Sequence, residues 1–366
     1  MWKKNILVLN YEFPPLGGWA SPVSYEISKW YVELGYNVDV ITMWFKNLPE
    51  FEKKDGMNIY RVKCLRIKKQ VCYPWEQLTY IFSWYKKAKK LLKQKNYDIC
   101  HCHFIIPTWV IAQKLKKNFW LDYIITAHWS DVLWHNPRFS LLYKVLKNPW
   151  KSIVKDAKNV ISPSKYLKTS IEKYYWKSDK IVVIPNGIEK DKFKPMKKEK
   201  YILIVSRLQK WKWIQDLIEA IKDIDLWEWK VKIVWEWPYK NELKNLVKKY
   251  NLEDKVEFLG WVDNRWKQMK KLYWKASIFC QSSYFESFWL TLLEAMQAGC
   301  FIVSRRNWWS EYVLENTNNI LFSDNKELRN ILSRLLKEKN VDWLENIEIV
   351  KKYEWDKIIL EYDKYL

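Results

Sequence analysis

Two glutamates, Glu286 and Glu294, lie eight positions apart around the start of an expected helix. The residues at that helix start are Ser287, Phe288, Trp289 and Leu290. The first N–H groups of a helix lie at the positive end of its dipole and bind anions. The pattern favours a site for a diphosphate or for sugar hydroxyls. The alternative is a helix start that carries two solvated glutamates.

A basic turn follows the apolar run Tyr201–Val205, which predicts a strand. The turn reads Ser206-Arg-Leu-Gln-Lys-Trp-Lys-Trp213 and carries Arg207 and Lys212. A guanidinium and an ammonium held by one turn suit two linked phosphates. Because lysine-rich turns are common in this chain, the signal taken alone is only moderately specific.

Two further polar segments are expected at strand ends. His128 lies in the segment Thr126-Ala-His-Trp-Ser-Asp131, where its ring could face a ligand, although a structural role is the alternative. Gly17, Gly18 and Trp19 follow the first strand, and the backbone amides of such a loop can meet a phosphate. The loop does not form the GxGxxG fingerprint of dinucleotide-binding domains.

The run Cys100-His101-Cys102-His103 has metal-ligand residue types, but it lies in an expected strand. Successive side chains of a strand face opposite sides, so the two cysteines and two histidines cannot converge on one ion. We therefore expect no metal at this run; we also expect no cofactor. The six cysteines lack the spacing of a disulfide framework, which indicates a reducing cytoplasm.

Tryptophan is unusually frequent, with 26 residues against only 7 glycines. Many of these tryptophans fall at strand ends and helix starts, where positive φ or close approach to a ligand favours a residue without a Cβ. This placement predicts that most of them are glycine in the organism, from a UGA codon that it reads as glycine. The alternative is a natural protein that is rich in tryptophan.

Short β-branched runs alternate with amphipathic stretches, which predicts parallel sheets covered by helices in two α/β domains. We expect residues 1–188 to form one domain and residues 189–341 a second, with a C-terminal helix at 342–366 packing back on the first. The expected strands are Asn5–Asn10, Val38–Thr42, Ile59–Val62, Ile99–Cys102, Tyr123–Ala127, Asn159–Ser162, Ile181–Ile184, Tyr201–Val205, Lys230–Val234, Val256–Leu259, Ile278–Gln281 and Phe301–Ser304. The clearest expected helices are Pro22–Leu34, Trp75–Lys95, Ile214–Ile221 and Tyr239–Tyr250.

The net charge of +22 calls for an anionic partner: nucleic acid, a phosphate-bearing substrate or a membrane surface. Lysines alternate with apolar residues over residues 85–95, which indicates a basic amphipathic helix. That helix is either a solvated face or a patch for an anionic membrane surface. No apolar run approaches the length of a membrane span, so we expect a cytoplasmic protein, peripheral at the inner face of the plasma membrane.

With the suspect tryptophans read as glycine, nearly the whole chain resembles a GT-B glycosyltransferase of the family 4 type. The matching segments are Glu12-Phe-Pro-Pro-Leu-Gly-Gly18, residues 128–131, Pro185-Asn-Gly-Ile188, Ser206-Arg207 with Lys212, residues 235–238, the glutamate pair and residues 308–311. Together these motifs are highly specific. Trp355, in Tyr353-Glu-Trp-Asp356, matches a family segment that does carry tryptophan, so we expect it to be genuine.

The resemblance implies two Rossmann-like doubly wound domains that face each other across a cleft. It also implies transfer of a sugar from a nucleotide diphosphate donor, with retention at the anomeric carbon and without metal. Arg207 and Lys212 would neutralise the diphosphate, Glu294 would hold the ribose hydroxyls, and Glu286 with the amides after it would hold the donor sugar. His128 would touch the sugar near the reacting centre, and the Gly17-Gly18 loop would approach the phosphates.

The resemblance leaves the acceptor open between a glycan and a lipid-linked molecule. A nucleotide-sugar 2-epimerase of the same fold and a basic nucleic-acid-binding protein are the alternatives, although no nucleic acid is expected as a partner. A third alternative is an inactive relic, because real tryptophans would obstruct the donor site. The residues concerned are Trp19, Trp129, Trp211, Trp213 and Trp289.

Overall fold

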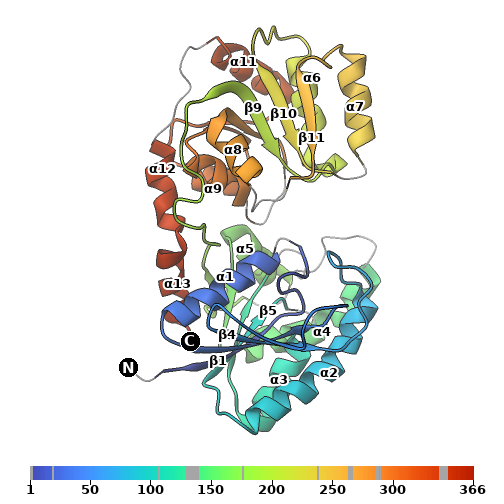
Figure 1. The fold of residues 1–366 in the computed structure, drawn as a ribbon, viewed down its shortest axis with the longest axis vertical. Helices are drawn as coiled ribbons and strands as arrows, with labels where there is room; N and C mark the ends of the chain where they lie inside the picture. Colours follow the sequence, from blue (N-terminus) through green and yellow to red (C-terminus); the bar gives the residue numbers. More distant parts are fainter. Residues whose placement is uncertain are drawn as a thin grey trace. The chain divides into compact units, whose positions relative to one another are not determined.

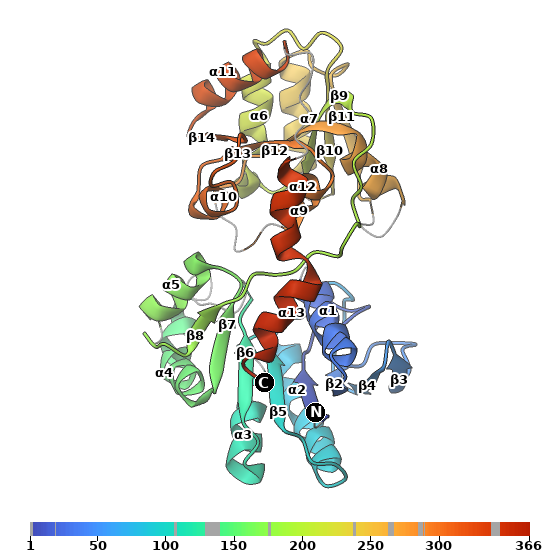
Figure 2. The ribbon, with the colours of Figure 1, turned by 90° about the vertical axis from the view of Figure 1, so that its left-hand side faces the viewer.

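The computed structural model of the chain describes residues 3–18, 20–105, 108–128, 140–174, 177–236, 239–262, 267–284, 288, 290–337 and 345–366. The chain divides into two compact units (Figures 1 and 2). The first unit comprises Met1–Gly187 together with Trp355–Leu366, and the second comprises Ile188–Glu354. Each unit is built on its own sheet.

The first unit contains an eight-stranded sheet in the order β3-β4-β2-β1-β5-β6-β7-β8. Its strands are β1 (Asn5–Leu9), β2 (Asn37–Met43), β3 (Phe51–Lys54), β4 (Met57–Val62), β5 (Ile99–His103), β6 (Tyr123–Thr126), β7 (Asn159–Ser162) and β8 (Ile181–Val183). Its helices are α1 (Ala20–Glu33), α2 (Pro74–Leu92), α3 (Trp109–Phe119), α4 (Ser140–Asp156), α5 (Lys165–Tyr174) and α13 (Trp355–Asp363). The pairing of β3 with β4 is antiparallel, and the other pairings are parallel.

The central strands of the first sheet are buried on both faces, as parallel sheets are, whereas the edge strand β3 is mostly exposed. On one face, Cys100 and Cys102 of β5 pack in an apolar cluster with Trp84 of α2 and Ile111 of α3. On the other face, His101 of β5 contacts helices α1 and α13. Strand β5 is therefore apolar on one side and carries histidine on the other, as period-two alternation requires.

The C-terminal helix α13 returns to the first unit and contacts α1. The indole of Trp355 lies against the backbone of Gly187, so that a Cβ added to this glycine would stand 2.2 Å from Cδ2 of the ring. A residue without a side chain is therefore required at position 187 for Trp355 to be buried.

The second unit contains a six-stranded parallel sheet in the order β11-β10-β9-β12-β13-β14. Its strands are β9 (Glu199–Val205), β10 (Lys230–Val234), β11 (Val256–Gly260), β12 (Ala276–Gln281), β13 (Phe301–Arg305) and β14 (Ile320–Phe322). Its helices are α6 (Ile214–Ile221), α7 (Lys240–Lys249), α8 (Lys267–Lys275), α9 (Leu290–Gln297), α10 (Trp308–Val313), α11 (Asn325–Leu335) and α12 (Glu345–Val350). Two apolar clusters line its two faces, one with α6, α7 and α11 and the other with α8 and α9.

Every strand expected from the sequence is present, with ends that agree to within two residues. Strands β3 and β14 were not predicted. The first is a half-polar edge strand, Phe51-Glu-Lys-Lys54, and the second is only three residues long, so neither carries a clear apolar pattern. The segment 342–366 is not one element, because α12 belongs to the second unit and α13 to the first.

Among the described residues, no helix combines the length and apolar character needed to cross a membrane.

Candidate functional site

In the second unit the strand order reverses beside β9, which has β10 on one side and β12 on the other. The carboxyl ends of parallel strands at such a switch point form the usual ligand-binding crevice of an open α/β sheet. The basic turn with Arg207 and Lys212 follows β9 directly. The residues Ser282 and Ser283 follow β12 and meet that turn. The structure therefore brings the predicted cations to the switch point.

Lys212 ends a single 3₁₀ turn, η3 (Lys210–Lys212), which leads into α6. Its side chain is buried, and its Nζ lies 4.1 Å from the ring centre of Trp211. Burial lowers the pKa of the Lys212 ammonium well below its ordinary value, and the positive charge of Arg207 lowers it further. Burial also lowers the pKa of Arg207. Two desolvated cations that repel each other are stabilised by a bound anion.

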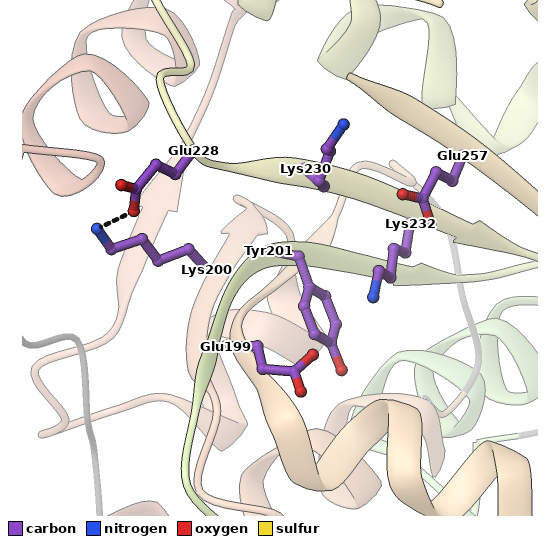
Figure 3. Close-up of a pocket in the computed structure, with 7 residues that line it drawn as sticks. All are labelled: Glu199, Lys200, Tyr201, Glu228, Lys230, Lys232 and Glu257. Atoms are coloured by element: carbon purple, nitrogen blue, oxygen red, sulfur yellow. Dashed lines mark hydrogen bonds and ion pairs between the residues drawn. The ribbon is translucent and has the colours of Figure 1, made fainter. Parts of the chain in front are cut away.

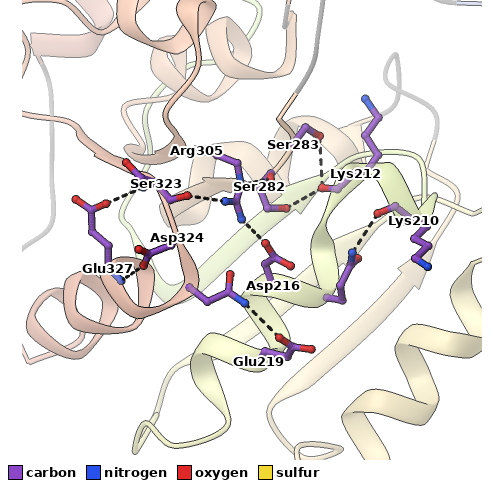
Figure 4. Close-up of polar contacts among 12 residues, drawn as sticks. Lys210, Lys212, Asp216, Glu219, Ser282, Ser283, Arg305, Ser323, Asp324 and Glu327 are labelled. Carbon is purple, nitrogen blue, oxygen red and sulfur yellow. Dashed lines mark hydrogen bonds and ion pairs between the residues drawn. The ribbon is translucent and has the colours of Figure 1, made fainter. Parts of the chain in front are cut away.

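A buried ion pair holds this turn in place (Figure 4). Arg305, at the end of β13, is fully buried and pairs with Asp216 in the first turn of α6. The Arg305 Nε donates to the carbonyl of Ser282 at 2.8 Å, and the Ser282 hydroxyl donates to the carbonyl of Lys212 at 3.0 Å. A chain of contacts thus links β13, β12 and the backbone of the lysine that faces the switch point.

Sequence reasoning missed Arg305 and Asp216. A charged residue that closes a buried apolar strand, as Arg305 does in Phe-Ile-Val-Ser-Arg, is the signal that could have indicated the pair.

We expect Arg305→Ala to lower the free energy of unfolding by about 3 to 5 kcal/mol, because it leaves Asp216 without its partner. The matched control is Arg306→Ala, since Arg306 is exposed and forms a long ion pair with the exposed Glu311, at 3.4 Å. That control should stay within about 0.5 kcal/mol of the parent. Urea unfolding of the three proteins is the measurement. Equal midpoints for parent and Arg305→Ala would contradict the structural role.

The predicted helix start at α9 is described only in part. Glu286, Ser287 and Trp289 lie outside the described residues. Phe288 is described, and its ring packs 4.3 Å from that of Trp309 between ring centres. Leu290 begins α9 and is half-buried.

Glu294 lies on α9 and is buried. Burial raises the pKa of the neighbouring Tyr273 phenol, and the Glu294 carboxylate raises it further. A buried carboxylate is suited to accept hydrogen bonds from paired hydroxyls.

His128 follows β6 in the first unit and is buried. Its Nε2 lies 3.4 Å from Nδ1 of His103, at the end of β5, and its ring contacts Phe104 with 4.5 Å between ring centres. Burial lowers the pKa of His128 to about 3, so the ring is neutral at ordinary pH. As a neutral imidazole it can both donate and accept a hydrogen bond.

The alternation expected in Cys100-His101-Cys102-His103 is confirmed. The two cysteine sulfurs are 3.8 Å apart on one face of β5, and the two histidine rings lie on the other, tilted to each other with 4.3 Å between centres. Within the described part of the chain, no group of three or more metal-ligating side chains is arranged to hold an ion.

The Gly17-Gly18 loop lies between β1 and α1, and Trp19 lies outside the described residues. Gly17 has φ of 92°, and an added Cβ would stand 2.6 Å from Cβ of Glu12. The Gly17 N–H donates to the carbonyl of Lys69 at 2.9 Å, and the Gly18 N–H donates to the Glu12 carboxylate at 3.2 Å. Both amides expected to meet a phosphate are therefore bonded within the unit, and a phosphate would have to compete with these contacts.

Four described tryptophans have positive φ: Trp120 (58°), Trp213 (57°), Trp227 (42°) and Trp235 (127°). An L-residue with a large side chain rarely adopts such a backbone, whereas glycine does so readily. Trp120 ends α3 in the left-handed conformation that glycine usually supplies there, and its side chain is 91% exposed. The backbone at these four positions therefore favours glycine.

A hollow in the second unit lies at the amino-terminal halves of β9 and β10, far along these strands from the Lys212 turn (Figure 3). Its lining residues are Glu199, Lys200, Tyr201, Glu228, Lys230, Lys232 and Glu257. The mixed charges include the ion pair of Lys200 with Glu228 at 2.7 Å. Ligands of open α/β sheets bind at the opposite, carboxyl ends of the strands.

Comparison with known proteins places the chain in a family. Its residues 187–350 match the family of glycosyl transferases group 1, and residues 20–192 match glycosyltransferase family 4. A glycosyltransferase of Methanocaldococcus jannaschii is 30% identical over 388 residues, which cover 99% of this chain and 97% of that protein. The chain belongs to the glycosyltransferases of the group 1 and family 4 type.

Two further proteins are similar to this glycosyltransferase, one in sequence and one in structure. The alpha-monoglucosyldiacylglycerol synthase of Streptococcus pneumoniae is 25% identical over 321 residues, which cover 81% of this chain and 69% of that one. The Anabaena HepE structure in complex with UDP and glucose superposes with a TM-score of 0.76 at 18% identity, covering 99% of this chain and 98% of that one. The fold is GT-B, with two Rossmann-like parallel-sheet domains, as the resemblance implied.

Proposed function

We propose that this glycosyltransferase moves a sugar from a nucleotide diphosphate donor to a glycan or lipid-linked acceptor, with retention at the anomeric carbon and without metal or cofactor. The observation that carries the proposal is the pair of cations, the half-buried Arg207 and the buried Lys212, at the switch point of the second sheet. The HepE complex with UDP and glucose, on the same fold, supports a nucleotide-sugar donor.

The chemistry assigns a role to each cation. When the bond between the anomeric carbon and the diphosphate breaks, negative charge grows on the departing phosphate oxygen. Lys212 and Arg207 would stabilise that charge most strongly because they are desolvated and already positioned. Cations held by the protein can perform this neutralisation in place of a metal ion.

The other predicted residues complete the proposed site. Glu294 would accept hydrogen bonds from the ribose hydroxyls, and Glu286 with the amides of residues 287–290 would hold the donor sugar. His128, as a neutral ring, would hydrogen-bond the sugar near the reacting carbon. The glycines Gly17 and Gly18 would let the first unit approach the phosphates closely.

The acceptor and the location are part of the proposal. A relative whose name describes synthesis of a glucosylated diacylglycerol supports a lipid-linked acceptor. We propose a cytoplasmic enzyme that works at the inner face of the plasma membrane, where such acceptors are available.

A panel of UDP-, GDP- and ADP-sugars tests the donor assignment by thermal shift. We expect one nucleotide class to raise the unfolding temperature of the parent with glycine at the suspect positions. Glu294→Ala should weaken that binding about 10- to 100-fold, since two charge-assisted hydrogen bonds to the ribose are lost. The control is Glu242→Ala, on the exposed side of α7. Unchanged affinity in Glu294→Ala would remove this residue from the ribose site.

A further inference from the structure

Large apolar side chains are exposed together in one segment of the first unit. Among the described residues, exposed large apolar side chains within residues 65–82 are Leu65, Ile67, Val71, Trp75, Leu78 and Phe82. Phe82 is 79% exposed, and Leu65, Ile67 and Leu78 are each 60% exposed. A concentration of this kind marks an interaction surface rather than scattered surface residues.

The part of this surface that lies on helix α2 forms a stripe along the helix. Leu78 and Phe82 are four residues apart on its exposed side, and the same side continues with Lys86, Lys89 and Lys93. The buried side packs in the core through Tyr80, Trp84, Ala88 and Leu91. The exposed stripe is therefore apolar over the first half of the helix and basic from there to its C-terminal end.

The loop before α2 is held with its apolar side chains outward. Glu76 is buried, and its carboxylate accepts from the N–H groups of Ile67 and Tyr73, both at 2.7 Å. The N–H of Leu65 donates to the Thr79 hydroxyl at 3.0 Å. Polar groups fix the loop on the helix from the inside, while Leu65 and Ile67 face solvent. This inversion of the usual burial is costly unless a partner covers the apolar side chains.

Charge identifies the partner. Residues 63–95 contain ten lysines and arginines and one acidic residue, the buried Glu76. A second copy of this chain would place like charges against this surface, which disfavours self-association. Nucleic-acid binders interleave cations with rings that stack on bases, whereas the exposed side chains here are mostly aliphatic. Aliphatic residues beside lysines fit acyl chains beneath anionic headgroups.

We propose that residues 63–73 and the exposed stripe of α2 form a docking surface for a bilayer that contains anionic lipid. Leu65, Ile67, Leu78 and Phe82 enter the boundary between headgroups and acyl chains, and Lys86, Lys89 and Lys93 contact lipid phosphates. The proposal rests on the proposed location at the inner face of the plasma membrane and is independent of the donor assignment, because vesicle binding is measured without nucleotide sugar.

Vesicle co-sedimentation of the full chain tests it, with phosphatidylcholine alone and with phosphatidylglycerol added. We expect binding only to the anionic vesicles. Replacing Lys86, Lys89 and Lys93 by glutamine should weaken it about 100-fold, at about 1 kcal/mol per lysine. Replacing Leu78 and Phe82 by glutamine should weaken it about 10- to 100-fold through lost apolar burial.

Controls carry the same changes elsewhere. The control for the lysine variant replaces three lysines of α7 by glutamine, Lys244, Lys248 and Lys249, and so has the same net charge. The control for the apolar variant is Leu360→Gln, which removes an exposed leucine of α13. Both controls should bind as the parent does, and thermal unfolding checks that all variants fold. Equal losses in variants and controls would overturn the proposal. If the parent does not bind vesicles but self-associates through Leu78 and Phe82, the surface belongs to contact with a second copy of the chain. That result would also overturn the proposal.

Discussion

Lys212→Ala should lower kcat for sugar transfer by about 10²- to 10³-fold, as loss of one preorganised donor to developing charge does in other enzymes. The effect should be large because the ammonium is buried beside Arg207 and the turn that carries it is tied to β12 through Ser282. The matched control is Lys210→Ala, two residues earlier in the same turn, whose side chain is exposed. It should remain within about twofold of the parent.

The pH dependence of donor binding distinguishes this role from a structural one. Burial lowers the pKa of Lys212 in the empty site, so the amine is in part neutral above that lowered pKa. A bound diphosphate raises the pKa again, so binding takes up a proton in the window between the two values. Affinity should therefore fall as pH rises through this window. Calorimetry in two buffers of different ionisation enthalpy measures the uptake, which Lys212→Ala should abolish. An active mutant with unchanged proton uptake would remove Lys212 from the site.

The second large effect concerns the tryptophans. We expect a synthetic version with glycine at the suspect positions, but with Trp355 kept, to bind nucleotide sugar and to transfer sugar, and the version as written to do neither. The reason is local: the Trp211 ring lies against the Lys212 ammonium, and Trp213, the residue after Lys212, itself has a φ of 57°. The thermal-shift panel and a transfer assay on both versions decide it. Equal donor binding by the two versions would show that these indoles leave the site open.

The positive φ angles allow the recoding hypothesis to be tested without an activity assay. Trp120→Gly alone should raise the free energy of unfolding by about 1 kcal/mol, since it relieves a left-handed residue whose exposed side chain contributes little burial. The control is Trp75→Gly, also exposed but with helical backbone in the first turn of α2, which should not raise the free energy of unfolding. Peptide mass spectrometry of the native protein then identifies the residue at 211, 213 and 235 directly. Tryptophan at all three would end the recoding hypothesis.

The structure places Lys212 and His128 after the strands where the sequence predicted them. Both were predicted at strand ends, and local patterning sufficed because each follows a strongly apolar strand, β9 and β6. The prediction for the Gly17-Gly18 loop was less complete. Its amides are bonded to Glu12 and Lys69, and the second of these partners is too distant in the chain for a local pattern to indicate.

The sequence by itself determined the alternation of strands and helices, the two α/β domains and the order in which the cations and His128 follow their strands, and its motifs carried the resemblance to GT-B enzymes. These features depend on apolar periodicity and on short motifs, which are local properties. Only the tertiary structure decided that Arg305 pairs with Asp216, 89 residues earlier, and that α2 turns Leu78 and Phe82 outward. Which side of an amphipathic helix is buried, and which charges meet, depends on how the sheet brings distant segments together.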